Sequence, residues 1–191
     1  MEGCPILSTL LARFAKLPDP RRRQGKMYPL APVLLFTVLA MLAGARSYRQ
    51  VHAFIETHLD RLNAEFGTKL PRAPAYSSVR FILHGLDGDA VEREFRAHAS
   101  GLLTPATEAE ADELPAISVD GKTLRGSFDA FNDRKAVHLL SAFAADEQII
   151  LGHLAIDEKS NEIPAAQALI AALGLEGRLY TLDAMHCQKN I

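Results

Sequence analysis

Apolar residues in the first hundred positions recur at the three- and four-residue spacing of amphipathic helices. Breakers such as "LPDPRRRQGKMYP" and "GTKLPRAPAYS" divide this part of the chain into separate segments. The spacing predicts helices over residues 8–16, 30–44, 48–62, 79–86 and 90–103. N-terminal caps are expected at Ser8, Ser47, Ser77 or Ser78, and Asp89. No convincing strand pattern occurs, so residues 1–103 are expected to form an all-α domain.

The periodicity changes after "TPATEAEADEL", residues 104–114, an acidic and Ala-rich segment that is typical of a linker. Beyond it, "PAISV" predicts a strand that ends at Asp120. "AVHLLSAFAADEQIILGHLAI" predicts two strands joined by a tight turn at Asp146–Glu147. "EIPAAQALIAALGLEG" predicts a helix, and "RLYTLD" a strand that ends at Asp183. Residues 115–191 therefore form a second domain of order β-β-β-α-β, and the fold class is α+β.

The most hydrophobic stretch is "LAPVLLFTVLAMLAGA", which includes a proline, a threonine and a glycine. Its 16 residues are fewer than the roughly 20 that a membrane-spanning helix needs. We therefore expect the buried central helix of a small bundle and no membrane partner.

Charge is divided unevenly along the chain. Residues 1–100 contain 14 Lys and Arg against 9 Asp and Glu, whereas residues 101–191 contain 7 against 14. A basic half is suited to phosphates and an acidic half to a cation, although ordinary surface variation also produces such a difference. Two cysteines, Cys4 and Cys187, at opposite ends form no disulfide framework. With no signal-peptide pattern at the N-terminus, this favours a reducing, cytoplasmic setting.

Two aspartates, Asp120 and Asp183, each follow an apolar strand directly. A helical crossover before the last strand favours a parallel arrangement with an earlier strand. If the last strand lies beside the first, the two carboxylates lie together at the carboxyl ends of their strands. Such a pair repels unless a cation lies between them, and hard oxygen ligands suit Mg²⁺ or Mn²⁺. The simpler interpretation is that both aspartates only end strands, where turns favour Asp.

Several long motifs resemble the transposases of a bacterial insertion-sequence family, also known as H-repeat-associated proteins. The motifs are "ISVDGKTLRGS", "KAVHLLSAFAAD", "DEKSNEIPAAQALI" and "YTLDAMHCQKN", and the N-terminal part adds "SYRQVHAF" and "APAYSSVRFILHGLD". The resemblance covers nearly the whole chain. It implies a helical transposase-associated domain, followed by the start of a ribonuclease-H-like catalytic domain of the DDE type.

The resemblance also implies a reaction and a site. Members bind Mg²⁺ or Mn²⁺ through three acidic residues, cleave DNA at transposon ends and join the ends to target DNA. Asp120 in "VDGK" and Asp183 in "TLDA" resemble the first and second acids, which would be catalytic and metal-binding. The implied partners are transposon-end and target DNA together with a homo-oligomer, in the cytoplasm of a bacterium and at its nucleoid when DNA is bound.

The third acid of the family, a glutamate on a later helix, has no counterpart after Asp183, because no Asp or Glu follows it here. A C-terminally truncated transposase is therefore expected, and its catalytic activity is left open. The alternative is a non-catalytic DNA-binding or interaction remnant; a metal-dependent hydrolase unrelated to DNA fits the motifs less well.

Basic residues supply the candidate DNA contacts. Lys122 and Arg125 follow the first aspartate and are expected to contact phosphate beside the metal. A second candidate is the run formed by Arg21, Arg22, Arg23 and Lys26, which would grip the DNA backbone. For both groups a solvated basic loop is the simpler interpretation.

Overall fold

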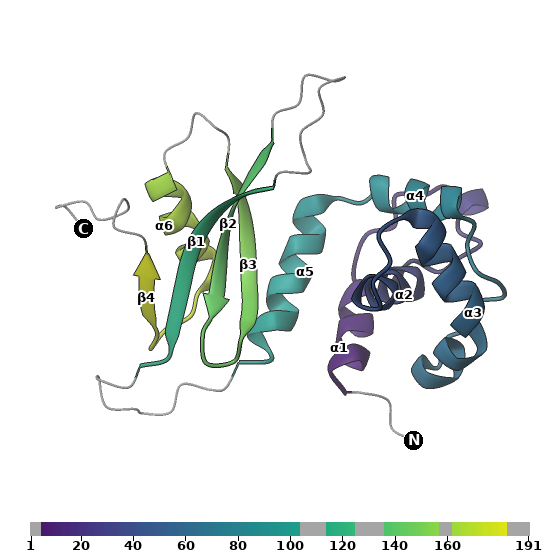
Figure 1. Cartoon of the computed structure of the whole chain (residues 1–191), viewed down its shortest axis with the longest axis horizontal. Coiled ribbons are helices and arrows are strands. Elements are labelled where there is room, and N and C mark those ends of the chain that lie inside the picture. The colour runs from purple at the N-terminus through teal and green to yellow at the C-terminus, as the bar shows by residue number, and fades with distance from the viewer. Residues whose placement is uncertain (1–4, 104–113, 125–135, 157–161, 183–191) are drawn as a thin grey trace. The chain divides into compact units, whose positions relative to one another are not determined.

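A computed structural model of the chain describes residues 5–103, 114–124, 136–156 and 162–182 (Figure 1). The chain divides into two compact units, Met1–His98 and Ala99–Ile191. The first is referred to below as the helical unit and the second as the sheet unit. The predicted linker lies almost entirely outside the described residues, so it stays a prediction.

The helical unit contains no strand among its described residues, as predicted. Its helices are α1 (Pro5–Phe14), the short 3₁₀ helix η1 (Arg23–Gly25), α2 (Leu30–Leu42), α3 (Tyr48–Phe66), α4 (Tyr76–His84) and α5 (Gly88–Ser100), which runs into the sheet unit.

Local hydrogen bonds define the ends of α3. The predicted cap at Ser47 is confirmed, because its Oγ accepts a hydrogen bond from the Gln50 amide at 3.3 Å. At the other end Gly67 adopts a φ of 60°, the left-handed conformation that favours glycine.

Three other predicted caps are wrong. Ser8 lies inside α1, which already begins at Pro5, a residue type that favours the first helical position. Ser77 and Ser78 lie in the first turn of α4, because the extended backbone at Ala75 lets the helix begin one residue later. α5 begins at Gly88, two residues earlier than expected, so Asp89 lies inside it, and Asp87 Oδ1 accepts from the Asp89 amide at 3.0 Å.

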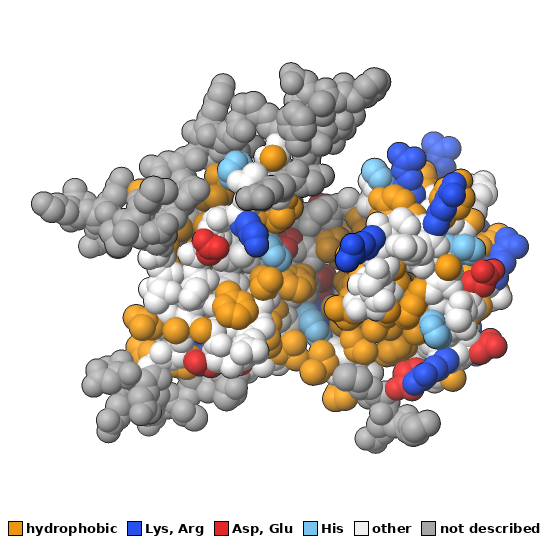
Figure 2. Space-filling model, in the orientation of Figure 1, with side chains coloured by type: hydrophobic (Ala, Val, Ile, Leu, Met, Phe, Trp, Pro, Cys, Tyr) orange, Lys and Arg blue, Asp and Glu red, His pale blue; other side chains and the backbone are white. Residues whose placement is uncertain are grey.

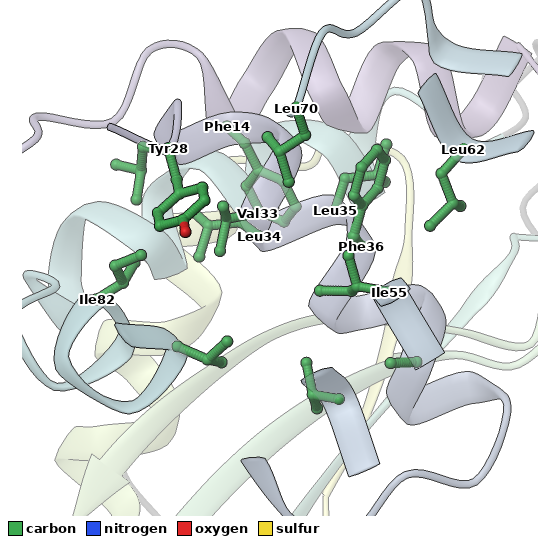
Figure 3. Close-up of a cluster of buried hydrophobic side chains, with 14 of the residues drawn as sticks. Phe14, Tyr28, Val33, Leu34, Leu35, Phe36, Ile55, Leu62, Leu70 and Ile82 are labelled. Carbon is green, nitrogen blue, oxygen red and sulfur yellow. The ribbon is translucent and has the colours of Figure 1, made fainter. Parts of the chain in front are cut away.

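α2 is the central helix of the helical unit, as its composition predicts. Val33, Leu35, Phe36 and Ala40 are completely buried, and Figure 3 shows side chains from the neighbouring segments converging on this helix. One described segment, Arg23–Leu42, is apolar and long enough to cross a membrane by length and composition, but half of it is buried in the protein. The regular helix within it has 13 residues, and it packs as a core helix.

The sheet unit contains a four-stranded mixed sheet, which confirms the α+β fold class and the β-β-β-α-β order. Its elements are β1 (Ala116–Leu124), β2 (Val137–Ala144), β3 (Ile149–Ile156), α6 (Glu162–Leu173) and β4 (Leu179–Leu182). The strand order is β3-β2-β1-β4. β1, β2 and β3 pair antiparallel, and β4 pairs with β1 in parallel. The last strand therefore lies beside the first, and their parallel pairing is the arrangement that the helical crossover favours.

β1 is longer than the sequence predicts. The expected end at Asp120 is wrong, because β1 continues to Leu124 while β2 pairs with it residue by residue, from Asp120 opposite Ser141 to Leu124 opposite Val137. Asp120 therefore lies in the interior of β1, and the residues before and after it both pair with β2.

The core of the sheet unit lies between α6 and one face of the sheet. Ile117, Leu140, Leu151 and Leu169 are completely buried there. Because side chains alternate along a strand, Ser118 and Asp120 point to the opposite face. At the start of β4, Arg178 forms an ion pair with Glu147 at 3.5 Å, with only 4% and 13% of their side chains exposed. This pair links the start of β4 to the turn between β2 and β3.

Candidate functional site

Asp120 lies on the polar face of β1. Its side chain is exposed, and the strand register places it opposite Ser141 of β2, which in turn lies opposite His153 of β3. Residues directly opposite each other share a face of the sheet. A polar row therefore crosses three strands, with the carboxylate at the β1 position.

β4 pairs with the part of β1 that directly precedes Asp120. Every pair in this parallel register joins residues 63 positions apart, from Ala116 opposite Leu179 to Val119 opposite Leu182. The side chains of one such pair are also in contact, since Ser118 Oγ and Thr181 Oγ1 lie 3.0 Å apart in a hydrogen bond. Asp183 follows Leu182 and lies outside the described residues. Its predicted place beside Asp120 stays a prediction.

The donor atoms suit the metal that the sequence predicts. Asp120 offers an exposed carboxylate, the ligand type that Mg²⁺ and Mn²⁺ prefer. Within the described ranges no three His, Cys, Asp or Glu side chains gather around one point. A complete site would therefore need at least one ligand from elsewhere, and Asp183 is the first candidate.

Of the two phosphate-binding candidates beside the metal, one is described. Lys122 lies two residues beyond Asp120 on the same face of β1, and it is exposed. Arg125 lies outside the described residues. The position of Lys122 agrees with the predicted contact to a phosphate near Asp120, which stays a prediction.

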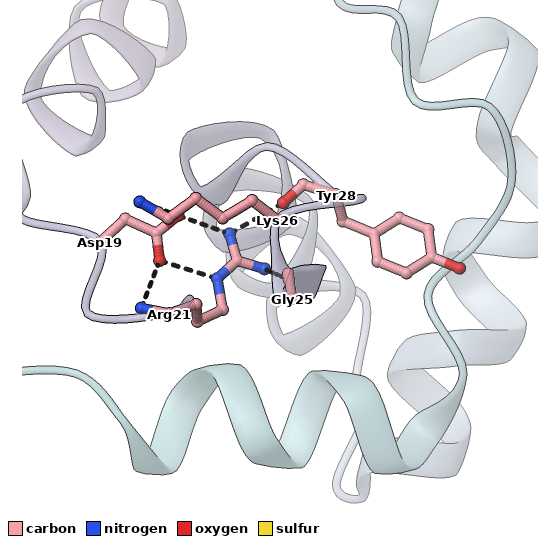
Figure 4. Close-up of polar contacts among 5 residues, drawn as sticks. All are labelled: Asp19, Arg21, Gly25, Lys26 and Tyr28. Carbon is pink, nitrogen blue, oxygen red and sulfur yellow. Dashed lines mark hydrogen bonds and ion pairs between the residues drawn. The ribbon is translucent and has the colours of Figure 1, made fainter. Parts of the chain in front are cut away.

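The basic run of the helical unit has two different parts. Arg21 is buried, with 9% of its surface exposed. Its guanidinium donates from Nε and Nη2 to the two carboxylate oxygens of Asp19, at 2.8 and 2.9 Å. It also donates to the backbone carbonyls of Gly25 at 3.2 Å and Tyr28 at 2.8 Å (Figure 4). Arg21 therefore stabilises the loop before α2, and most of its donors are unavailable to DNA.

The other members of the run are accessible. Arg22, Arg23 and Lys26 are all exposed, and Lys26 Nζ lies 3.9 Å from Asp19 Oδ2. Sequence reasoning could not separate Arg21 from its neighbours, because only the folded loop brings the carbonyls of Gly25 and Tyr28 to the guanidinium.

Acidification is expected to destabilise the helical unit through Asp19. The side-chain hydrogen bond from Arg21 lowers the pKa of the Asp19 carboxyl below its ordinary value of 3.8. The unfolded chain therefore takes up this proton first as the pH falls. The stabilisation is complete above 3.8 and is lost as the pH falls through the lower, folded-state pKa. Urea unfolding of the wild type and Asp19→Asn between about pH 6 and about pH 2 measures this. The two stability curves should converge at low pH, and a constant separation would contradict the expectation.

The structure also shows a surface that sequence reasoning missed. The outward face of α4 carries Tyr76, Arg80, Phe81 and His84, all exposed. Beside it lies an open groove of about 580 Å³, lined among others by Met27, Tyr28, His52, Arg72, Ser78 and Phe81. Aromatic residues in an amphipathic helix are typical of a core, so the pattern alone favours burial. The available signal was helical position. Tyr76 and Phe81 are five residues apart and do not fall on the face that the buried residues Val79 and Ile82 define.

Known proteins resemble both units of the chain. The family model described as DDE_Tnp_1-associated matches residues 11–99, which is nearly the whole helical unit. No solved structure matches the chain.

Curated relatives align with both units. The chain is 31% identical over 185 residues to "H repeat-associated putative transposase YhhI" of Escherichia coli K12, covering 97% of this chain and 47% of that protein. It is 32% identical to "Putative transposase YncI" of the same strain, covering 97% of this chain and 72% of the relative. "H repeat-associated putative transposase YbfD" is 29% identical, with 97% and 70% covered. The chain spans about half the length of the longer relatives.

Proposed function

Because this chain belongs to the family of H-repeat-associated transposases, and its function is therefore related to transposition, we propose that it contributes to metal-dependent cleavage and joining of DNA. Asp120 and Asp183 are the two carboxylates that hold the metal. The partner is DNA, both at the ends of the mobile element and at its target, within the bacterial cytoplasm. A homo-oligomer is the natural assembly, since two ends must be processed together.

The observation that supports this proposal most directly is the register between β1 and β4. The described pairs join residues 63 positions apart up to Val119 and Leu182, and we propose that the same register extends by one residue to Asp120 and Asp183. The hydrogen bond between Ser118 and Thr181 already places the preceding side chains of this face within 3.0 Å of each other. In that proposed extension the two carboxylates would lie side by side on the polar face, because residues paired across neighbouring strands share a face.

Each residue has a defined part in the proposed reaction. When bound, Mg²⁺ or Mn²⁺ would supply the positive charge that stabilises phosphoryl oxygens and activates an attacking oxygen. Asp120 and Asp183 would supply the carboxylate oxygens that hold this ion. Lys122 and Arg125 neutralise neighbouring phosphates and so fix the strand in position.

Asp120 and Asp183 are two of the three carboxylates that the family resemblance implies. The first testable property of the site is therefore capture of the metal, and DNA cleavage is the second. Testing them separately distinguishes a metal site from a complete catalytic centre.

Mn²⁺ is expected to bind the full chain at Asp120. In NMR spectra the paramagnetic ion should broaden amide signals of Ser118, Val119 and Thr181 before those of other residues. Asp120→Asn should weaken Mn²⁺ binding by about tenfold or more in calorimetry, because one of two charged ligands becomes neutral. The matched control is Asp146→Asn, the same change at an exposed aspartate in the turn after β2. It should leave binding unchanged.

Nicking of supercoiled DNA in Mg²⁺ or Mn²⁺ is the second measurement. Nicking that depends on the metal and disappears in Asp120→Asn would establish catalysis by this chain. Binding of DNA without metal capture or nicking would support the non-catalytic alternative. If Mn²⁺ broadened signals elsewhere, or bound Asp120→Asn as well as wild type, the metal site would be wrong.

A further inference from the structure

Contacts along its inward face and at both ends hold α4 in a fixed position in the helical unit. The inward residues Val79 and Ile82 are buried in the core of the helical unit. The loop before the helix is tied down by His52, whose Nδ1 donates to the Pro74 carbonyl at 3.0 Å. Its C-terminal end is also held, since Tyr48 Oη lies 3.5 Å from His84 Nε2. The exposed side chains of α4 therefore project from a fixed helix.

This face exposes an unusual amount of aromatic surface. Phe81 is 67% exposed and Tyr76 47% exposed. Arg49 of α3 lies over the Tyr76 ring, with its Cζ 5.2 Å from the ring centroid. This cation–π contact holds a positive charge at the edge of the aromatic surface. Exposed apolar surface beside fixed cations is typical of an interaction site rather than an ordinary solvated helix.

The charge around this face is mostly positive. The segment from Gly67 to Leu86 contains no Asp or Glu, but it contains Lys69, Arg72 and Arg80 in addition to His84. The carboxylate of Glu56, on the neighbouring α3, lies 3.8 Å from His52 Nε2. Figure 2 shows Lys and Arg side chains gathered over the edge of the helical unit where Figure 1 places α4, and acidic side chains mostly farther away. An acidic partner is therefore favoured.

We propose that this face, Arg49, Arg72, Tyr76, Arg80 and Phe81, binds duplex DNA with α4 in the major groove. The proposal rests on the proposed function, which makes DNA the partner, and adds the surface that holds it. The major groove, about 12 Å wide, admits one α-helix. Arg80 and Phe81, which lie on either side of the middle of the outward face of α4, face the base edges, where arginine pairs with guanine and phenylalanine contacts the thymine methyl group.

The flanking arginines contact the phosphates on either side of the groove. Arg49 is exposed beside Tyr76. Arg72 is held at its position by donating from Nε to Tyr28 Oη at 3.1 Å. Positions fixed in this way set the register of the helix on the duplex, because phosphate contacts position a protein and base contacts give it specificity.

Fluorescence anisotropy of the full chain with a labelled duplex of mixed sequence and about 30 base pairs tests the proposal. The double variant Arg49→Gln/Arg80→Gln should weaken binding about tenfold or more at about 0.1 M salt, and the slope of log affinity against log salt should fall by about 2. The matched control, Arg61→Gln/Arg93→Gln, removes the same charge from exposed positions on α3 and α5. It should change affinity by less than about twofold.

Phe81→Ala separates the aromatic contact from charge. It should weaken binding about fivefold and leave the salt dependence unchanged, because it removes no cation. The thermal midpoint of each variant should equal that of the wild type, since the side chains that are changed are exposed.

The outcomes distinguish this surface from the proposed function. If wild type binds the duplex and the α4 variants bind like the control variant, the surface is wrong while DNA remains the partner. If a single strand or an RNA duplex of the same length binds more tightly than the DNA duplex, the major-groove assignment is wrong. If wild type binds no DNA at all, both proposals fail.

Discussion

Phe36→Ala is expected to lower the free energy of unfolding of the helical unit by about 3–5 kcal/mol. Phe36 is completely buried in α2, and its ring centroid lies 6.2 Å from that of Phe66. Figure 3 shows it among side chains that come from other segments of the helical unit. Truncation removes the transfer free energy of the ring and leaves a cavity that rigid helices on several sides cannot fill.

Urea unfolding followed by the amide signals of α2 and α3 measures this loss. Phe81→Ala is the control, because the same atoms are removed from a side chain that is 67% exposed. It should change the free energy of unfolding by less than about 0.5 kcal/mol. The core of the sheet unit is a separate cluster of residues, so signals from β2 should lose less stability than those from α2. Equal losses for both phenylalanines would show that the described core is not the one that stabilises the unit.

Arg21→Ala is expected to cost about 3 kcal/mol of stability. The substitution removes four hydrogen bonds and leaves the Asp19 carboxylate, 19% exposed, without its main partner. It also leaves the Gly25 and Tyr28 carbonyls without this donor. A charge that loses its partner in a partly buried site is strongly destabilising, whereas an exposed ion pair contributes at most about 1 kcal/mol.

Arg22→Ala is the appropriate comparison for this prediction. Arg22 is the adjacent residue and carries the same charge, but it is exposed. Its removal should cost less than about 0.5 kcal/mol in the same unfolding experiment. A similar cost for both substitutions would mean that the basic run acts through total charge and not through the buried guanidinium.

Local sequence signals predicted much of the fold. The cap at Ser47, the buried α2 and the antiparallel turn between β2 and β3 follow from short-range spacing, and the structure confirms them. Structural features that depend on pairing with residues distant along the chain could not be predicted from the local sequence. The segment after Asp120 contains glycine and polar residues that argue against a strand, yet pairing with β2 extends β1 to Leu124.

In the candidate site, too, some features could be predicted from the sequence and others depend on residues that are distant along the chain. Motif resemblance identified Asp120 and Asp183. The crossover rule favoured a parallel arrangement of the last strand with an earlier one, and the structure shows that this earlier strand is β1. The burial of Arg21 and the exposure of Phe81 could not be predicted. Both depend on which face of a short segment packs against the rest of the helical unit, and an isolated basic run or amphipathic pattern does not contain that information.

The extension of β1 has a consequence for ligand affinity. Asp120 sits inside a continuous ladder, opposite Ser141, and not in a turn beyond the end of a strand. Its backbone is already ordered before any ligand arrives, so an incoming ion or phosphate does not have to immobilise it. Immobilising a residue costs about 1–2 kcal/mol of conformational entropy. Preorganisation of this kind makes association less costly and keeps the side chain directed to the same face of the sheet from one encounter to the next.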